Sequence, residues 1–288
     1  MRRIGLGRAT VLAVAVGTCF AACAEPPHGY DAPRAVVHDP VADVWLVANR
    51  DAVGGYVARV EPAGGMERHW IRHGSGGVTL RAPTGLALGG DLLWVADGVA
   101  LRAFDRVSGA PRGAVPIPGA TALADVAVGP DGAIWCSDRG VTEDGRATGT
   151  DAIWRLADGT LPPHEPPIAV CRGADLGQPT ALVARTGSVY VVGRDGQFFS
   201  VDAKGRRSDL ATAPARDLVG LVRVEAADGR AAWFASSASG TLHRFDVGGG
   251  ATALPRTFGD LGDLGYDARR GVLLLPLVAA DRIERLAP

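Results

Sequence analysis

Short hydrophobic runs recur along the chain at a nearly constant distance, with turn residues between them. The centres of these runs are aromatic or large aliphatic residues, spaced 49, 41, 55, 43 and 41 residues apart: Trp45, Trp94, Trp135, Tyr190, Trp233 and Leu274. Turn signals precede the runs, as in Gly89-Gly90-Asp91 and Pro130-Asp131-Gly132. Repeats of about 40–45 residues are typical of the blades of a β-propeller. The spacing therefore predicts six blades.

Each hydrophobic run is flanked by further short segments that read as strands. A segment rich in small residues precedes it, as expected for the crowded innermost strand of a blade. A segment with alternating apolar and variable residues follows it, which is the pattern of a half-buried strand. Weaker fourth strands are predicted at Met66–Arg72, Ala114–Ile117, Ile168–Cys171, Ser208–Ala211 and Thr252–Arg256.

The predicted fold is an all-β, six-bladed propeller with four-stranded blades. The sixth blade has sequence for only three strands before Pro288. We therefore expect Pro27–Pro33 to supply its fourth strand, latch the ring and cover the sheet edge.

Composition agrees with this fold and excludes several classes of protein. Hydrophobic residues make up 47% of the 288 residues, enough for a sizeable core and too many for a disordered chain. The 40 glycines and 19 prolines are too frequent for long helices and suit short strands joined by turns. The net charge of −1 gives no electrostatic signature of nucleic-acid binding.

The first residues have the features of a targeting segment. Arginines cluster in the first eight residues, and the uncharged, largely apolar run Ala9–Ala22 follows them. This run is too short for a membrane span and is typical of a signal peptide. We predict a signal peptide over residues 1–23 and a single propeller domain over residues 24–288.

The junction at Cys23 resembles a bacterial lipobox, so Cys23 is the predicted lipidation site. The lipid would be the protein's only contact with a membrane. Because Ala24 is not Asp, the sorting rule of enteric bacteria favours the outer membrane, facing the periplasm. An alternative cleavage before Glu25 would give a soluble periplasmic protein.

Neighbouring blade strands are antiparallel, so the starts of the innermost strands and the ends of the second strands meet at one face. That face surrounds the mouth of the central channel. Arg194 and the long loop Ser137–Asp151 belong to it, and the loop is either a lid or a solvated excursion. The candidate ligand-binding residues there are Arg34, Asp97, Asp125, Asp138, Arg139, Thr180 and Asp263.

Two of these candidates have an alternative interpretation. Asp97 and Asp138 each lie three residues after a tryptophan at a blade centre. Either they act at the mouth, or they bind the backbone of a neighbouring turn.

The stretch Gly77–Leu156 resembles bacterial members of the senescence marker protein, gluconolactonase and luciferin-regenerating enzyme family. Matching segments include Val78–Leu86, Leu93–Asp97 and Gly149–Ala152, and Leu264–Asp267 matches near the C-terminus. The resemblance extends over essentially the whole mature chain, and NHL-type propellers are similar in general. It implies a six-bladed propeller. In catalytic members it also implies one divalent cation at the mouth.

The residues at the family's ligand positions differ from those of its catalytic members. Those members use a Glu, two Asn and an Asp, and here the positions hold Arg34, Ala124, Thr180 and Val219. Calcium takes six to eight oxygen ligands, and only Thr180 offers one. We therefore expect no metal and no cofactor. The alternative is a divergent, calcium-dependent lactonase or hydrolase that uses Asp125, Asp138 or Asp263 instead.

The remaining cysteines, histidines and sequence motifs give little indication of a reactive or metal-binding site. Cys136 and Cys171 fall on the second and fourth strands of one blade, about 9.6 Å apart, so we expect two buried free thiols. His69 and His73 have no third metal ligand nearby. No nucleophile elbow, phosphate loop or zinc signature is present.

The sequence thus predicts an exported, non-catalytic propeller of the cell envelope. Its partner would be a small molecule or an envelope protein, bound at the mouth of the channel.

Overall fold

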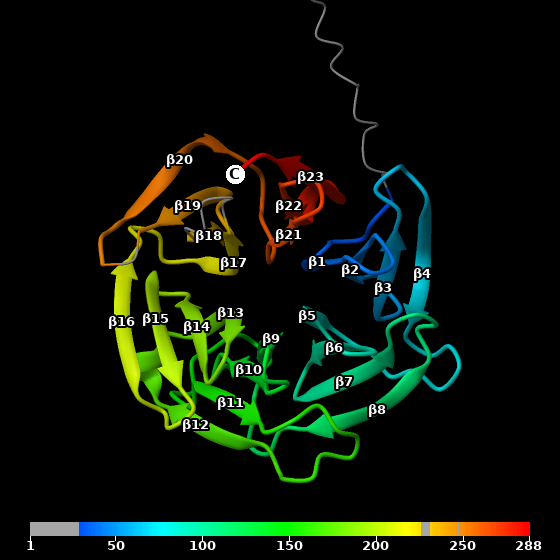
Figure 1. The fold of residues 1–288 in the computed structure, drawn as a ribbon, viewed down its shortest axis with the longest axis horizontal. Coiled ribbons are helices and arrows are strands. Elements are labelled where there is room, and N and C mark those ends of the chain that lie inside the picture. Colours follow the sequence, from blue (N-terminus) through cyan, green and yellow to red (C-terminus); the bar gives the residue numbers. More distant parts are fainter. Residues whose placement is uncertain (1–28, 226–230, 247) are drawn as a thin grey trace, which may run out of the picture.

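The computed structural model describes residues 29–225, 231–246 and 248–288, and these form a ring of six antiparallel sheets (Figure 1). This arrangement confirms the predicted all-β, six-bladed propeller. The innermost strands β1, β5, β9, β13, β17 and β21 surround the central channel, and the outermost strands form the rim. Cys23, where cleavage and lipidation are predicted, lies outside the described residues.

The blades follow the chain, and each is named here by its order. Blade 1 contains β1 (Ala35–Asp39), β2 (Val44–Arg50), β3 (Gly55–Val60) and β4 (Met66–Arg72). Blade 2 contains β5 (Pro83–Gly89), β6 (Leu92–Asp97), β7 (Ala100–Asp105) and β8 (Pro111–Pro116). Blade 3 contains β9 (Leu123–Val128), β10 (Ile134–Asp138), β11 (Ala152–Leu156) and β12 (Ile168–Arg172).

The second half of the ring repeats this arrangement. Blade 4 contains β13 (Pro179–Arg185), β14 (Ser188–Gly193), β15 (Gln197–Asp202) and β16 (Arg207–Thr212). Blade 5 contains β17 (Leu218–Glu225), β18 (Ala231–Ser237), β19 (Thr241–Phe245) and β20 (Ala251–Thr257). Blade 6 contains β21 (Gly265–Asp267), β22 (Val272–Leu277) and β23 (Arg282–Leu286). Two single turns of 3₁₀ helix, η1 (Ala174–Leu176) and η2 (Val278–Ala280), complete the described elements.

The hydrophobic core lies between adjacent blades. Trp94 of blade 2 is 1% exposed and packs in one cluster with Ile134 and Val126 of blade 3. The same arrangement recurs around the ring, which is why the second strand of every blade is apolar on both faces. Burial of one large apolar side chain contributes about 1.5–3 kcal/mol. Among the described residues, no helix has the length and hydrophobicity needed to cross a bilayer.

The ring closes differently from the prediction. Blade 6 has three strands, and the described part of the predicted latch, residues 29–33, forms no strand. Closure comes instead from side-chain packing and polar contacts between blades 1 and 6. Tyr30 is 2% exposed and packs with Leu274 and Ile283, while Trp45 Nε1 donates to Asp267 at 2.9 Å. A sequence pattern cannot distinguish such packing from a strand, because both need apolar residues at the same seam.

The two described cysteines are free, as predicted. Cys136 lies on β10 and Cys171 on β12, with β11 paired between them. Cys136 is fully buried, but Cys171 is only half-buried, so the prediction of two buried thiols is wrong for Cys171. The reason is its position on an outermost strand, which no further strand covers.

Candidate functional site

A β-bulge lies at the channel end of four innermost strands. In β5, Pro83 pairs with Asp97 and Gly85 pairs with Ala96, which leaves Thr84 as the extra residue. The same shift in β9, β13 and β17 leaves Ala124, Thr180 and Val219 as extra residues. Bulges turn a side chain away from the regular pleat and are frequent beside functional sites. Here they direct one residue per blade toward the mouth.

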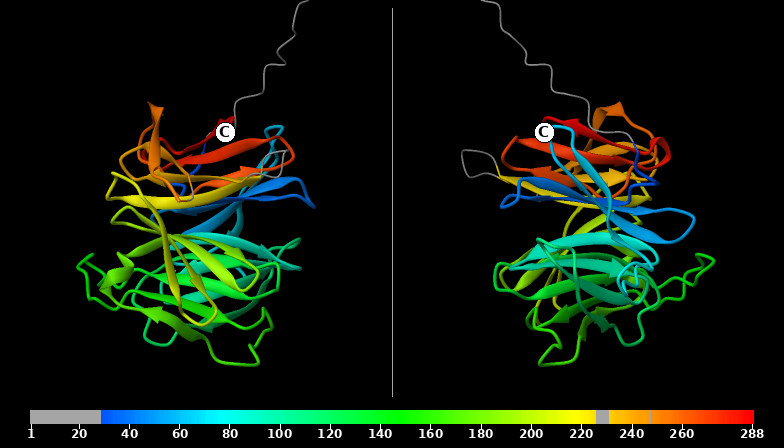
Figure 2. Two further views of the ribbon diagram at one scale, coloured as in Figure 1. Left: turned by 60° about the vertical axis from the view of Figure 1, so that its left-hand side comes forward. Right: turned by 90° about the vertical axis from the view of Figure 1, so that its right-hand side faces the viewer.

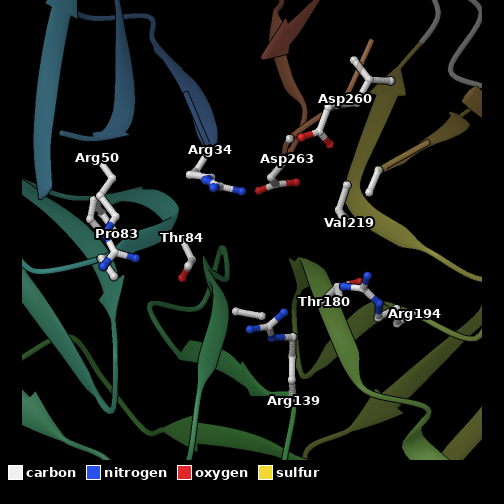
Figure 3. Close-up of a pocket in the computed structure, with 15 residues that line it drawn as sticks. Arg34, Arg50, Pro83, Thr84, Arg139, Thr180, Arg194, Val219, Asp260 and Asp263 are labelled. Atoms are coloured by element: carbon white, nitrogen blue, oxygen red, sulfur yellow. The ribbon is translucent and has the colours of Figure 1, made fainter. Parts of the chain in front are cut away.

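These bulge residues line a cavity of about 430 Å³ at the mouth of the channel, together with Arg34 and Gly262 from blades 1 and 6. Arg34 precedes β1, and the N–H of Gly262 donates to Pro276 in β22 at 2.9 Å. The remaining polar residues of the cavity wall are Arg50, Arg139, Arg194, Asp260 and Asp263 (Figure 3). The structure therefore brings together Arg34, Ala124, Thr180 and Val219, the four positions that the sequence resemblance assigns to metal ligands.

The residues at these four positions do not fit a divalent cation. Ala124 and Val219 have no oxygen, and Arg34 carries a positive charge. The Thr180 hydroxyl, which donates its proton to the backbone carbonyl of Leu218 at 2.9 Å or Val192 at 3.1 Å, is the one side-chain oxygen among the four positions, and a single neutral oxygen is too few for calcium. Within the described residues, no group of three or more His, Cys, Asp or Glu side chains is arranged to hold a metal ion.

Arginines reach the cavity from the ends of the second strands. Arg50 ends β2, and Arg139 and Arg194 directly follow β10 and β14. The backbone N–H of each donates to a carbonyl in the loop that leads to the innermost strand of its own blade, at 3.0–3.1 Å. This bond fixes where each side chain leaves the strand. The repeated position, one residue past a hydrophobic run, is the signal in the sequence that identifies Arg50 and Arg194 alongside Arg139.

Arg139 lies in an unusual environment. Its Nε is buried and has no hydrogen-bond partner in the described structure. Burial lowers the pKa of its guanidinium, and the neighbouring positive charges of Arg194 and Arg34 lower it further, against the opposing effect of Asp138. Figure 3 shows the Arg34 and Arg139 guanidinium groups directed toward the open centre of the cavity.

Asp97 and Asp138 are not part of the cavity wall. Asp97 accepts the backbone N–H groups of Arg81 and Ala82 at 2.8 and 2.7 Å, and Arg102 Nε at 2.8 Å. Both carboxylates bind the loop that leads into the innermost strand of their own blade.

Asp138 accepts the backbone N–H groups of Thr121 and Ala122 at 2.8 Å, and that of Gly140 at 3.2 Å. The geometry of both acids agrees with the second of the two interpretations of the sequence, in which they bind neighbouring turns.

Asp125 and Asp263 occupy corresponding positions in blades 3 and 6, one residue after the mouth-facing residue. Asp125 is 3% exposed and does not contact the cavity, whereas Asp263 is half-buried and lines it. Burial raises the pKa of both carboxyl groups, and the charge of Asp125 raises that of Asp263 further. Of the three acids considered for a divergent hydrolase, only Asp263 lines the cavity.

The loop between β10 and β11 projects from one face of the ring (Figure 2). Its base is fixed by Asp151, which is 2% exposed and accepts the backbone N–H of Gln178 at 2.6 Å. Glu143 and Asp144 at its tip are exposed. A second cavity of about 400 Å³ lies between this loop and blade 4, and Arg194 lines both cavities. A role of the loop as a lid stays a prediction.

Solved structures with similar folds were found by comparison. A gluconolactonase from Xanthomonas campestris superimposes with a TM-score of 0.63 at 18% identity, covering 86% of this chain and 83% of its own. The likeness establishes the fold alone. The β-propeller domain of Cps50 (Swd1) from Myceliophteria thermophila gives a TM-score of 0.58 at 13% identity, covering 90% and 97%. No family model matches the chain, and no curated protein sequence matches it.

Proposed function

We propose that this protein is an exported, non-catalytic propeller of the cell envelope. It binds a small molecule or an envelope protein at the mouth of its central channel. It is a divergent relative of the gluconolactonase family that retains the propeller and has lost the metal site. One observation carries the proposal: the mouth-facing residues of the ring include Arg34, Ala124 and Val219 where a metal-dependent lactonase needs oxygen ligands.

Two physical arguments support the loss of catalysis. A cation beside Arg34 would be repelled, since two unit charges 4 Å apart interact by about 4 kcal/mol at an effective dielectric of 20. The candidate acids offer no replacement, because the oxygens of Asp138 and Asp125 already accept backbone N–H groups.

Export and the lipid anchor on Cys23 are supported by the charged and apolar segments that precede it.

The decisive experiment is a thermal-shift screen of the purified protein with divalent metals, lactones and cell-wall fragments, followed by a lactone hydrolysis assay. We expect ligands to raise the melting temperature without metal, and no lactone to be hydrolysed. Calcium-dependent stabilisation together with hydrolysis that a chelator abolishes would overturn the proposal. That result would establish the divergent hydrolase in its place.

A further inference from the structure

The mouth cavity gathers positive charge that the protein does not neutralise. Four arginines line it, and none forms an ion pair within the part of the chain that the structure describes: Arg34, Arg50, Arg139 and Arg194. Elsewhere on the described surface, arginines commonly pair with acids, as Arg102 pairs with Asp97 and Arg270 with Asp43. The lack of partners is therefore a local property of the mouth.

The cavity wall contains only two acids to oppose the four arginines, Asp260 and Asp263. Asp260 is exposed, and Asp263 accepts the backbone N–H of Leu221 at 3.2 Å. Even with both acids ionised, the cavity has an excess of two positive charges. Protonation of Asp263 would increase that excess.

Arg139 supplies a second, independent observation. Its Nε is buried without an acceptor, and a buried donor without a partner is costly. Thr180, which also lines the cavity, makes its hydrogen bonds to backbone carbonyls and none to Arg139 Nε. The missing partner is an acceptor, and an anionic acceptor would also offset the repulsion between Arg139 and Arg194.

The dimensions and chemistry of the cavity limit the ligand. A volume of about 430 Å³ is within the range of small-molecule sites, roughly 300–1,000 Å³. The planar guanidinium group matches the two oxygens of a carboxylate or phosphate and can bind both at once. The bulge residues Ala124 and Val219 add apolar surface for the carbon skeleton of an organic molecule.

We infer that the mouth binds a small organic anion through a carboxylate or phosphate group held by Arg139 and Arg194, with Arg34 facing it. This inference rests on the proposed function, in which the mouth is a binding site, and names the ligand class. Arg50 lies at the exposed edge of the same cavity and contributes to the field that attracts the anion.

Isothermal titration calorimetry with citrate, inorganic phosphate and neutral glucose tests the inference, and the two anions distinguish carboxylate from phosphate ligands. We expect saturable binding of at least one anion with a stoichiometry of one, and none of glucose. Stoichiometry is essential, because citrate and phosphate stabilise many proteins without a site. The affinity should fall as NaCl is raised from 50 to 500 mM, since salt screens charge.

Arginine variants locate the site. Arg139→Gln and Arg194→Gln should each weaken anion binding at least tenfold, about 1.4 kcal/mol. Arg112→Gln removes the same charge from an exposed side chain on β8, outside the cavity, and should leave the affinity unchanged. If Arg139→Gln does not fold, Arg194→Gln provides the same test from a half-buried position.

The outcomes separate this inference from the proposed function. Anion binding that survives both arginine substitutions would overturn the inference. So would a mouth that binds neutral sugars or lactones but neither anion, with binding blocked by Ala124→Trp, although the proposed binding function would then stand. If neither anions, neutral sugars, lactones nor cell-wall fragments bind, the inference fails together with the small-molecule part of the proposed function.

Discussion

The carboxylate of Asp125 accepts the backbone N–H of Leu182 at 2.7 Å and so joins the innermost strands of blades 3 and 4. Its second oxygen accepts the N–H of Val126 at 2.7 Å. Asp263 makes a contact of the same kind in the opposite direction around the ring, from blade 6 to the N–H of Leu221 in blade 5 at 3.2 Å. One buried acid and one half-buried acid thus connect neighbouring blades at the mouth, and this arrangement determines how the ring responds to pH and to substitution.

Stability should decrease as pH rises through the titration of this pair. Burial raises the pKa of Asp125 to about 7, above the value of about 3.9 in an unfolded chain. Between these values the folded protein keeps a proton that the unfolded chain has released, so its free energy of unfolding falls with rising pH. We expect denaturant unfolding of Asp125→Asn to show a flatter profile between pH 5 and pH 8 than the parent.

The difference between parent and variant should be on the order of a few kcal/mol across this window, since one pKa unit corresponds to about 1.4 kcal/mol. Glu143→Gln, in the exposed loop of blade 3, serves as the control and should leave the profile unchanged. Parallel profiles for the parent and Asp125→Asn would contradict this account of Asp125.

Gly85 is a second point at which adjacent blades approach closely. A Cβ atom there would lie 2.2 Å from Asp125 Oδ1 and 2.6 Å from its Cα. We expect Gly85→Ala to reduce the free energy of unfolding by about 1–3 kcal/mol, the usual cost of overpacking. Gly259→Ala is the matched control, because nothing lies within 4 Å of its added Cβ. Equal stability of the two variants, measured by urea unfolding, would contradict the packing argument.

Restoring oxygen ligands at the mouth should create a calcium site. The variant Arg34→Glu, Ala124→Asn, Thr180→Asn, Val219→Asp removes one positive charge, adds two negative ones and supplies four oxygen-bearing side chains. We expect calorimetry to show calcium binding with a dissociation constant of about 1 mM or tighter in the variant. Arg34→Gln alone removes the charge without adding a carboxylate and should bind no calcium. Tight calcium binding by the parent would show that the mouth has other ligands.

The two described cysteines should differ in reactivity. Cys136 is fully buried, and Cys171 is half-buried on a rim strand. Burial raises the pKa of both thiols, so neither is an activated nucleophile. We expect iodoacetamide to label Cys171 slowly in the native protein and Cys136 only after unfolding, as read by peptide mass mapping. A peptide that joins the two cysteines by a disulfide would mean that the strand order in blade 3 is wrong.

Mass spectrometry of the mature N-terminus tests the proposed anchor. We expect a diacylglyceryl-modified Cys23 in protein expressed with its own leader, and a membrane fraction that releases it only with detergent. Cys23→Ser should abolish the modification and leave the protein in the soluble fraction or unprocessed. An unmodified chain that begins at Glu25 would show that the alternative cleavage site is used.

The sequence by itself determined the blades, because the signal for a strand is local. The weaker strand signal of Met66–Arg72 and the hydrophobic run around Trp94 depend only on a few neighbouring residues, and both strands lie where the pattern placed them. The position of Arg34, Thr180 and Val219 at the mouth was also predictable, whereas the bulge in β9 places Ala124 there and not the predicted Asp125. The predictable positions follow from repeating one strand order around a ring.

Tertiary structure decided the contacts that depend on how the ring closes and how side chains are satisfied. No local pattern states that Tyr30 packs against blade 6 in place of a strand, since partners about 250 residues apart meet only in the closed ring. Likewise, Asp138 and Asp263 look equivalent as acids in the sequence. The Asp138 carboxylate accepts backbone N–H groups, whereas Asp263 faces a cavity lined by unpaired arginines. The difference arises because each carboxylate binds the nearest donors that folding brings to it.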